Sequence, residues 1–97
     1  MKEKISNKIS EEKIDKYFKL TKTAIRNIKE NIIKGKEKEA KEIIDMAENY
    51  ISDAEHFFSK GDYVNCFAAL NYAHGWIDSG VRLSIFDVCD DRLFTIK

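Results

Sequence analysis

Apolar residues recur at helical spacing along most of the chain. Over residues 11–34 they are separated by alternating steps of four and three, with one threonine among them: Ile14, Phe18, Thr21, Ile25, Ile28 and Ile32. This spacing places them on one side of an α-helix. Ser10 precedes the stretch and can act as N-cap, because its hydroxyl can accept a hydrogen bond from a free backbone N–H. The pattern predicts a first helix over residues 11–34, after a polar lead of residues 1–10.

The widest apolar face lies in residues 37–60. Its members are Ala40, Ile43, Ala47, Tyr50, Ala54 and Phe57, flanked by Ile44, Ile51 and Phe58. Gly35 precedes this stretch and Gly61 follows it, and glycine readily adopts the positive φ that chain reversals after helices require. A second helix over residues 37–60, with reversals at both glycines, is therefore predicted. One continuous helix through Gly35 stays open as an alternative, because no good N-cap follows that glycine.

A third helix is predicted over residues 62–86, with Asp62 as its N-cap. On a helical wheel its core face centres on Ala73 and includes Cys66, Ala69, Leu70, Trp76, Ile77, Gly80 and Leu83. The opposite side holds Asn71, Gly75, Asp78 and Arg82. The remaining residues, 87–97, form a short tail. Its segment 93–96 has strand propensity but no sheet edge to pair with.

Three helices of similar length joined by short turns predict an all-α fold, an antiparallel up-and-down three-helix bundle with a short C-terminal tail. The 97 residues suffice for one domain, residues 1–97. Hydrophobic residues at 43% and charged residues at 35% are typical of a soluble globular domain and argue against a membrane span. The polar start of the chain contains no signal-peptide pattern, so we expect a cytoplasmic protein with reduced thiols at Cys66 and Cys89.

The formal net charge is zero, which excludes a bulk attraction to nucleic acid or anionic lipid. Lysines outnumber arginines by fourteen to three, which suits a hydrated helix surface better than recognition of bases or phosphates. Six cations nevertheless lie on exposed sides of the first helix: Lys13, Lys16, Lys19, Lys22, Arg26 and Lys29. A nucleic-acid-binding accessory role for this helix is therefore kept as the alternative function, although no aromatic residues interleave with the cations.

Two resemblances arise around the second turn. Residues 57–63, followed by Cys66, Leu70 and Ala73, resemble the turn of a single tetratricopeptide hairpin. Gly61-Asp62-Tyr63, residues 68–78 and residues 80–83 together resemble the archaeal domain-of-unknown-function family 357. The motifs of this family cover residues 50–87, whereas residues 1–49 agree only in helix pattern. The resemblance implies an archaeal three-helix bundle and implies no activity, cofactor or catalytic residue.

Candidate chemistry is sparse. His74, Asp78 and Arg82 follow one another at one-turn spacing, and such a trio could do acid–base work, but a surface ion pair beside a boundary histidine is the simpler interpretation. The Cys and His residues do not have zinc-ligand spacing. We therefore predict no enzymatic activity, no metal and no cofactor, and the sequence identifies no small-molecule substrate. Trp76 and Cys66 are predicted to fill the core.

Gly75 is the least expected residue of the third helix. A glycine inside a helix costs about 1 kcal/mol relative to alanine, and the wheel places this one on the outer side, where another chain could approach closely. Its placement inside the bundle stays open as the alternative. The predicted interaction surface consists of Ala68, Asn71, Tyr72, Gly75 and Ser79 with the tail residues Leu93, Phe94 and Ile96. It predicts a protein-interaction or self-association module, most simply a symmetric homodimer.

Overall fold

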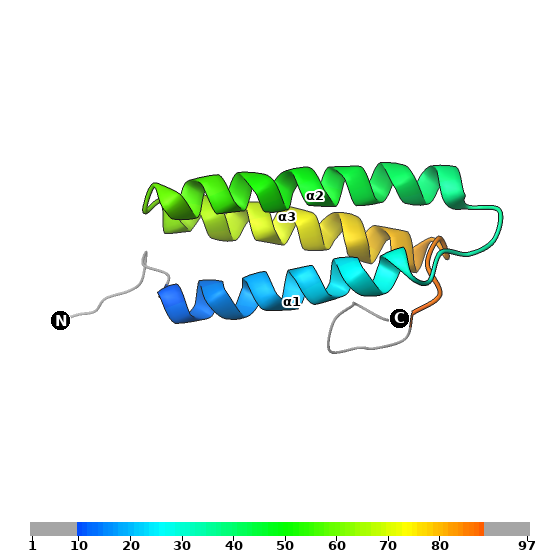
Figure 1. Cartoon of the computed structure of the whole chain (residues 1–97), viewed down its shortest axis with the longest axis horizontal. Helices are drawn as coiled ribbons and strands as arrows, with labels where there is room; N and C mark the ends of the chain where they lie inside the picture. The colour runs from blue at the N-terminus through cyan, green and yellow to red at the C-terminus, as the bar shows by residue number, and fades with distance from the viewer. Residues whose placement is uncertain (1–9, 89–97) are drawn as a thin grey trace.

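The computed structural model describes residues 10–88 and contains three helices: α1 (Glu11–Lys29), α2 (Glu37–Ser59) and α3 (Tyr63–Arg82). They contain 78% of the described residues. Each helix runs opposite to the one before it, so that α1 and α3 point the same way (Figure 1). The predicted all-α, antiparallel up-and-down bundle is confirmed.

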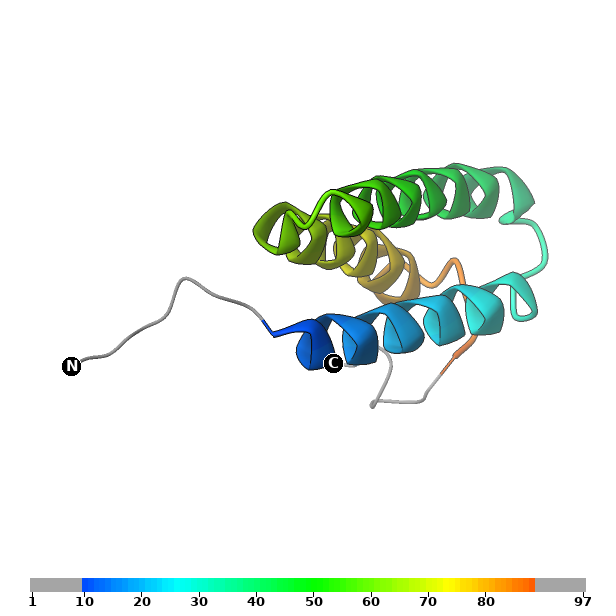
Figure 2. The same cartoon turned by 60° about the vertical axis from the view of Figure 1, so that its left-hand side comes forward.

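The most extensive helix contact is between α2 and α3, whereas α1 packs mainly on α3 and least on α2. Figure 2 shows α2 and α3 side by side, with α1 below them.

The turn between α2 and α3 contains Gly61 at φ 75°. The N–H groups of Gly61 and Asp62 donate to the carbonyls of Phe58 and Phe57 at 3.0 and 2.9 Å, which is a Schellman motif. Asp62 then caps α3 by accepting from the N–H of Asn65 at 3.2 Å. Gly61 and Asp62 therefore reverse the chain and start α3 as the sequence predicted.

The first helix is shorter than predicted, because α1 ends at Lys29 rather than at residue 34. Beyond it, the N–H of Ile33 donates to the carbonyl of Ile85 at 2.9 Å, and the N–H of Asp87 donates to the carbonyl of Asn31 at 2.7 Å. Two segments that follow α1 and α3 thus pair in an antiparallel sense. Ile32 and Ile33 are β-branched and readily adopt an extended backbone. Residues 31–33 therefore pair with residues 85–87 instead of forming the last turn of the predicted helix.

The chain reverses between α1 and α2 in a loop rather than directly after a helix. Gly35 lies in this loop at φ 93°, and the N–H of Lys36 donates to the carbonyl of Ile33 at 2.9 Å. The alternative of one continuous helix through Gly35 is therefore wrong. Glu37 begins α2, and its carboxylate accepts from the N–H of Gly35 at 3.0 Å.

The third helix also ends early, at Arg82 rather than at residue 86. Ser84 adopts φ 61°, and the N–H groups of Ser84 and Ile85 donate to the carbonyls of Val81 and Gly80. This is a second Schellman motif, with serine where glycine is usual. The prediction that Leu83 lies in the core is wrong, since its side chain is 68% exposed. The reason is that the chain turns back here, so that the next two residues close the end of the bundle instead.

The core consists of two clusters along the bundle. The larger one contains Ala24, Ile25, Ile28, Ala40, Ile43, Ala47, Ile51, Ala73, Ile77, Ile85 and Phe86. The smaller one contains Ile14, Ala54, Cys66, Ala69 and Leu70. The predicted stripes therefore supply most of the core, and Cys66 is fully buried as expected. Burial raises the pKa of the Cys66 thiol, which makes this residue a poor nucleophile.

Candidate interaction surface

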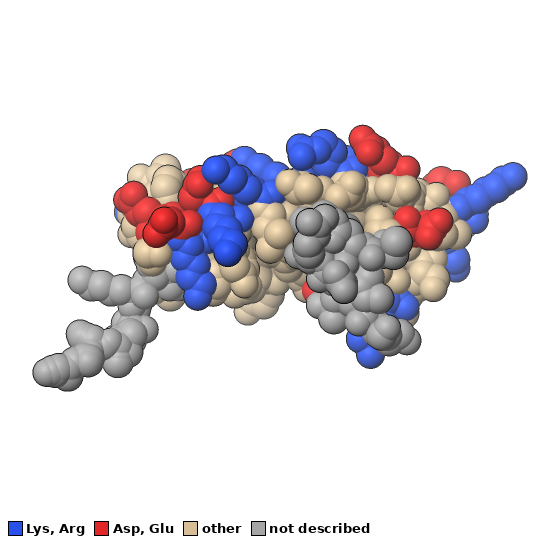
Figure 3. Space-filling view, turned by 90° about the horizontal axis from the view of Figure 1, so that it is seen from below, with Lys and Arg blue, Asp and Glu red and all other residues tan. Residues whose placement is uncertain are grey.

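The outer face of α3 is free of charge over most of its length. Residues 63–77 contain no Asp, Glu, Lys or Arg, whereas α1 and α2 carry charged residues on nearly every turn. Among the side chains that α3 leaves exposed, Val64, Tyr72 and Trp76 are large and apolar. Figure 3 shows the molecule from the side on which α1 lies in Figure 1, where Lys and Arg side chains lie next to Asp and Glu at both ends and along the upper edge. The face of α3 is thus unlike the surface of the other two helices.

A groove lies in this face at Gly75. It has a volume of about 370 Å³, and the residues that line it are Asn71, Tyr72, Gly75, Trp76 and Ser79. A Cβ atom added at Gly75 would meet nothing within 4 Å. Gly75 therefore faces outward, and the alternative that places it inside the bundle is wrong. The hydroxyl of Ser79 donates to the carbonyl of Gly75 at 2.8 Å.

Four of the residues predicted to form an interaction surface gather in this groove: Asn71, Tyr72, Gly75 and Ser79. Ala68 is half-buried and does not line it. The remaining three, Leu93, Phe94 and Ile96, lie outside the described residues. These four residues therefore lie together in one groove, and their role in an interaction stays a prediction.

Trp76 is not the core residue that the wheel predicted. Its side chain is 38% exposed and forms a wall of the groove. Small buried residues stand on the two sides of the α2–α3 contact, namely Ala47 and Ala54 on α2 and Ala69 and Ala73 on α3. An indole does not fit between helices that approach this closely, so the ring stays at the edge of the contact.

Tyr72, which lines the groove one helical turn before Trp76, is held by an aromatic neighbour on α2. The centroids of the Tyr50 and Tyr72 rings are 5.3 Å apart, at an angle of 34° between the ring planes. Such a contact restricts the Tyr72 ring although 62% of the side chain is exposed. The sequence contained no signal for this pair, because its two members come from different helices.

His74 points toward α1 rather than into the groove. Its ring lies edge-on to the Tyr17 ring at a centroid distance of 6.2 Å. The Nε2 atom is buried and has no hydrogen-bond partner. Burial lowers the pKa of His74, and the nearby charge of Asp78 partly opposes this effect. Arg82 is exposed at the end of α3, and neither His74 nor Arg82 lines the groove at Gly75.

The lowered pKa of His74 predicts a loss of stability in mild acid. The unfolded chain binds a proton at the ordinary pKa near 6.5, whereas the folded chain resists it, so the unfolded state gains protons first. We expect the free energy of unfolding to decrease as the pH falls through 6.5, by less than about 1.4 kcal/mol per pH unit. Urea unfolding between pH 7.5 and 5.5, which spans the ordinary histidine pKa, measures how the free energy of unfolding changes with pH. The slope should shrink in His74→Phe and persist in His56→Gln, because His56 is exposed; equal slopes in all three proteins would contradict the prediction.

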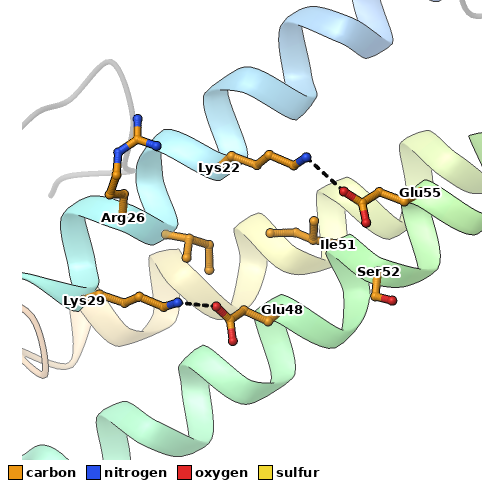
Figure 4. Close-up of a pocket in the computed structure, with 8 residues that line it drawn as sticks. Lys22, Arg26, Lys29, Glu48, Ile51, Ser52 and Glu55 are labelled. Carbon is orange, nitrogen blue, oxygen red and sulfur yellow. Dashed lines mark ion pairs between the residues drawn. The ribbon is translucent and has the colours of Figure 1, made fainter.

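A second groove, of about 400 Å³, lies between α1 and α2 (Figure 4). Ile25 and Ile51 contribute its apolar surface. Two ion pairs cross it, Lys22 to Glu55 at 2.9 Å and Lys29 to Glu48 at 2.5 Å. The Arg26 side chain, which also borders the groove, points away from α2 (Figure 4). Lys22 and Lys29 are seven residues apart, and so are Glu48 and Glu55. This equal spacing was the sequence signal for the two ion pairs, but the partners can be matched only when the antiparallel order of the helices is known.

The cations of α1 are largely engaged within the protein. Besides the two lysines paired across the groove, Lys19 pairs with Asp15 at 3.2 Å. The Lys13 ammonium lies 5.2 Å from the centroid of the Phe67 ring. Of the six cations on this helix, only Lys16 and Arg26 lack such a partner among residues 10–88.

Within residues 10–88, no three Cys, His, Asp or Glu side chains are grouped as a metal ion would require. No helix in this range is long and apolar enough to cross a membrane.

The fold and this surface define a small all-α bundle protein whose third helix leaves an uncharged face exposed. The family model described as "Protein of unknown function (DUF357)" matches residues 16–86. Because the match covers most of the chain, the protein belongs to this family, as the sequence motifs indicated. Neither a curated protein nor a solved structure matches the sequence. The archaeal source and the tetratricopeptide likeness stay predictions.

Proposed function

We propose that the protein is a non-catalytic interaction module of the cytoplasm that binds a protein partner through the outer face of α3. The observation that carries the proposal is the uncharged face of residues 63–77 with its groove at Gly75. Tyrosine and tryptophan are enriched at protein interfaces, and both border this groove. The free thiol of Cys66 in the core agrees with a reducing compartment.

Covering the α3 face with a partner costs little electrostatic free energy. Desolvating a charge that remains unpaired is expensive, and residues 63–77 contain no carboxylate, ammonium or guanidinium group. Gly75 has no side chain, so another backbone can approach this turn closely. Nucleic-acid binding through α1 has less support, because Lys19, Lys22 and Lys29 already form ion pairs within the bundle.

The proposal is tested by placing a carboxylate in the groove. In Gly75→Glu the new side chain projects outward into open space, so the circular dichroism of the helices should stay unchanged. Any complex that uses this face should weaken at least about tenfold, since an unpaired buried carboxylate costs more than 1.4 kcal/mol. The measurement is affinity capture from a cell extract, together with sedimentation of the pure chain, for wild type and variant.

Asn49→Glu is the matched control, because it adds the same side chain at an exposed position of α2 away from the face. Complexes of the control should equal those of wild type and should persist at high salt, because apolar contacts are not screened. Nucleic-acid binding would instead fall steeply with salt. The proposal is wrong if Gly75→Glu keeps every complex that wild type forms.

A further inference from the structure

We infer that α1 contains a pH-sensitive hinge: in mild acid its N-terminal half, residues 11–21, opens away from α3 while its C-terminal half stays packed. The trigger is the uptake of a proton by His74. The inference concerns the inner side of α3 and is independent of the proposed function, which uses the outer side of that helix.

Two buried polar atoms border the N-terminal half of α1. Among residues 10–88, the Thr21 hydroxyl on α1 and the Nε2 atom of His74 on α3 are buried without a hydrogen-bond partner. The Tyr17 ring lies edge-on to the His74 ring, and Thr21 follows Tyr17 by one turn on the same side of α1. A buried polar atom without a partner destabilises the contact that encloses it. This half of α1 is therefore packed less favourably than a wholly apolar helix face would be.

The two halves of α1 are anchored unequally. The C-terminal half contributes three residues to the larger core cluster, namely Ala24, Ile25 and Ile28. The chain just beyond it is tied to residues 85–87 by backbone hydrogen bonds. The N-terminal half contributes only Ile14 to the smaller core cluster, with Tyr17 and Phe18 partly buried at its edge. A movement of α1 therefore pivots at the C-terminal half and separates the N-terminal half from α3.

Protonation of His74 favours this open form. In the closed bundle burial lowers the pKa of His74, and Asp78 is the only charged group of residues 10–88 that shifts it the other way. The side chain that faces the ring from α1 is the uncharged phenol of Tyr17. In the open form water solvates the ring, which then takes up a proton near the ordinary pKa of 6.5. The population of the open form therefore rises as the pH falls through 6.5, by at most about tenfold per pH unit.

Opening uncovers an apolar surface that the closed bundle hides. Besides Ile14 itself, the smaller core cluster consists of Ala54, Cys66, Ala69 and Leu70. The hydrogen bond from the Tyr63 hydroxyl to the Glu11 carboxylate is lost at the same time. Both of these groups are exposed, so water can replace that bond at small cost. Access to the cluster is thus controlled by the protonation state of His74.

Hydrogen exchange tests the hinge in the unmodified protein. Amide exchange is measured over the same pH range as the urea unfolding, and each rate is divided by the intrinsic rate of that amide at the same pH. We expect the amides of residues 15–21 to be at least about tenfold less protected than those of residues 24–28, because they exchange without global unfolding. Their protection should decrease further as the pH falls through 6.5.

Two results in wild type would overturn the inference. Equal protection of both halves of α1 at every pH would mean that the helix opens only together with the whole bundle. Weaker protection of residues 15–21 that does not change with pH would mean that His74 is not the trigger, as when its ring simply turns outward.

Three variants identify the residues that act. In His74→Phe the protection of residues 15–21 should stay constant over this pH range, whereas His56→Gln should behave like wild type, because His56 is exposed. Thr21→Val keeps the β-branched shape and removes the unpartnered hydroxyl, so it should raise the protection of residues 15–21 several-fold at every pH. A pH dependence that persists in His74→Phe would also overturn the inference.

Discussion

The Ile43→Asp variant is expected to lose the helical circular-dichroism signal of the folded protein. Ile43 is 6% exposed and belongs to the larger core cluster, where residues of all three helices surround it. Burying an unpaired carboxylate there costs several kcal/mol. A domain of this size is stable by only about 5–15 kcal/mol, so this one change removes much or all of the margin. Far-ultraviolet circular dichroism and urea unfolding measure the effect.

Asn49→Asp is the control for this prediction. It introduces the same side chain on α2 at an exposed position, where water solvates the charge. Its unfolding free energy should stay within about 0.5 kcal/mol of wild type, as is usual for surface changes. If Ile43→Asp were folded and as stable as this control, the core position of Ile43 would be refuted.

Gly80→Ala is expected to destabilise the protein by about 1–3 kcal/mol, the usual cost of overpacking a core. An added Cβ would lie 2.4 and 2.8 Å from two ring carbons of Phe86, and 2.9 Å from Cδ1 of Ile43. Both neighbours are buried, so neither can move without disturbing the end of the bundle. The midpoint of urea unfolding should therefore decrease.

The second glycine of α3 provides the matched control. A Cβ at Gly75 would meet nothing within 4 Å, so Gly75→Ala should gain about 1 kcal/mol from helix propensity alone. The two variants make the same chemical change on one helix and should shift the urea midpoint in opposite directions. The comparison is made on dilute, monomeric chain, so that association does not contribute. Shifts of the same sign would show that the two glycines do not differ in environment.

The three helices and most of their core faces could be predicted, because they depend on interactions between residues close in sequence. Steps of three and four identified the buried side of α2, including Ile43, before any packing was known. The turn at Gly61 and the cap at Asp62 follow from the chemistry of those two residues alone. The helical wheel also favoured an outward position for Gly75, and the structure decided against the alternative inside the bundle, because a Cβ at Gly75 would meet nothing within 4 Å.

What the sequence did not decide depends on contacts between distant residues. The ends of α1 and α3 are set by the pairing of residues 31–33 with residues 85–87, and the local helical pattern continued past both ends. The helical wheel predicted Trp76 and Leu83 on the core face of α3, but both lie outside the core. The interior there is closed by neighbouring helices or filled by Ile85 and Phe86. The sequence by itself therefore determined which segments become helical and which side of each faces inward. The tertiary structure decided where the helices stop and which large side chains stay at the surface, because both depend on the space that the other helices leave.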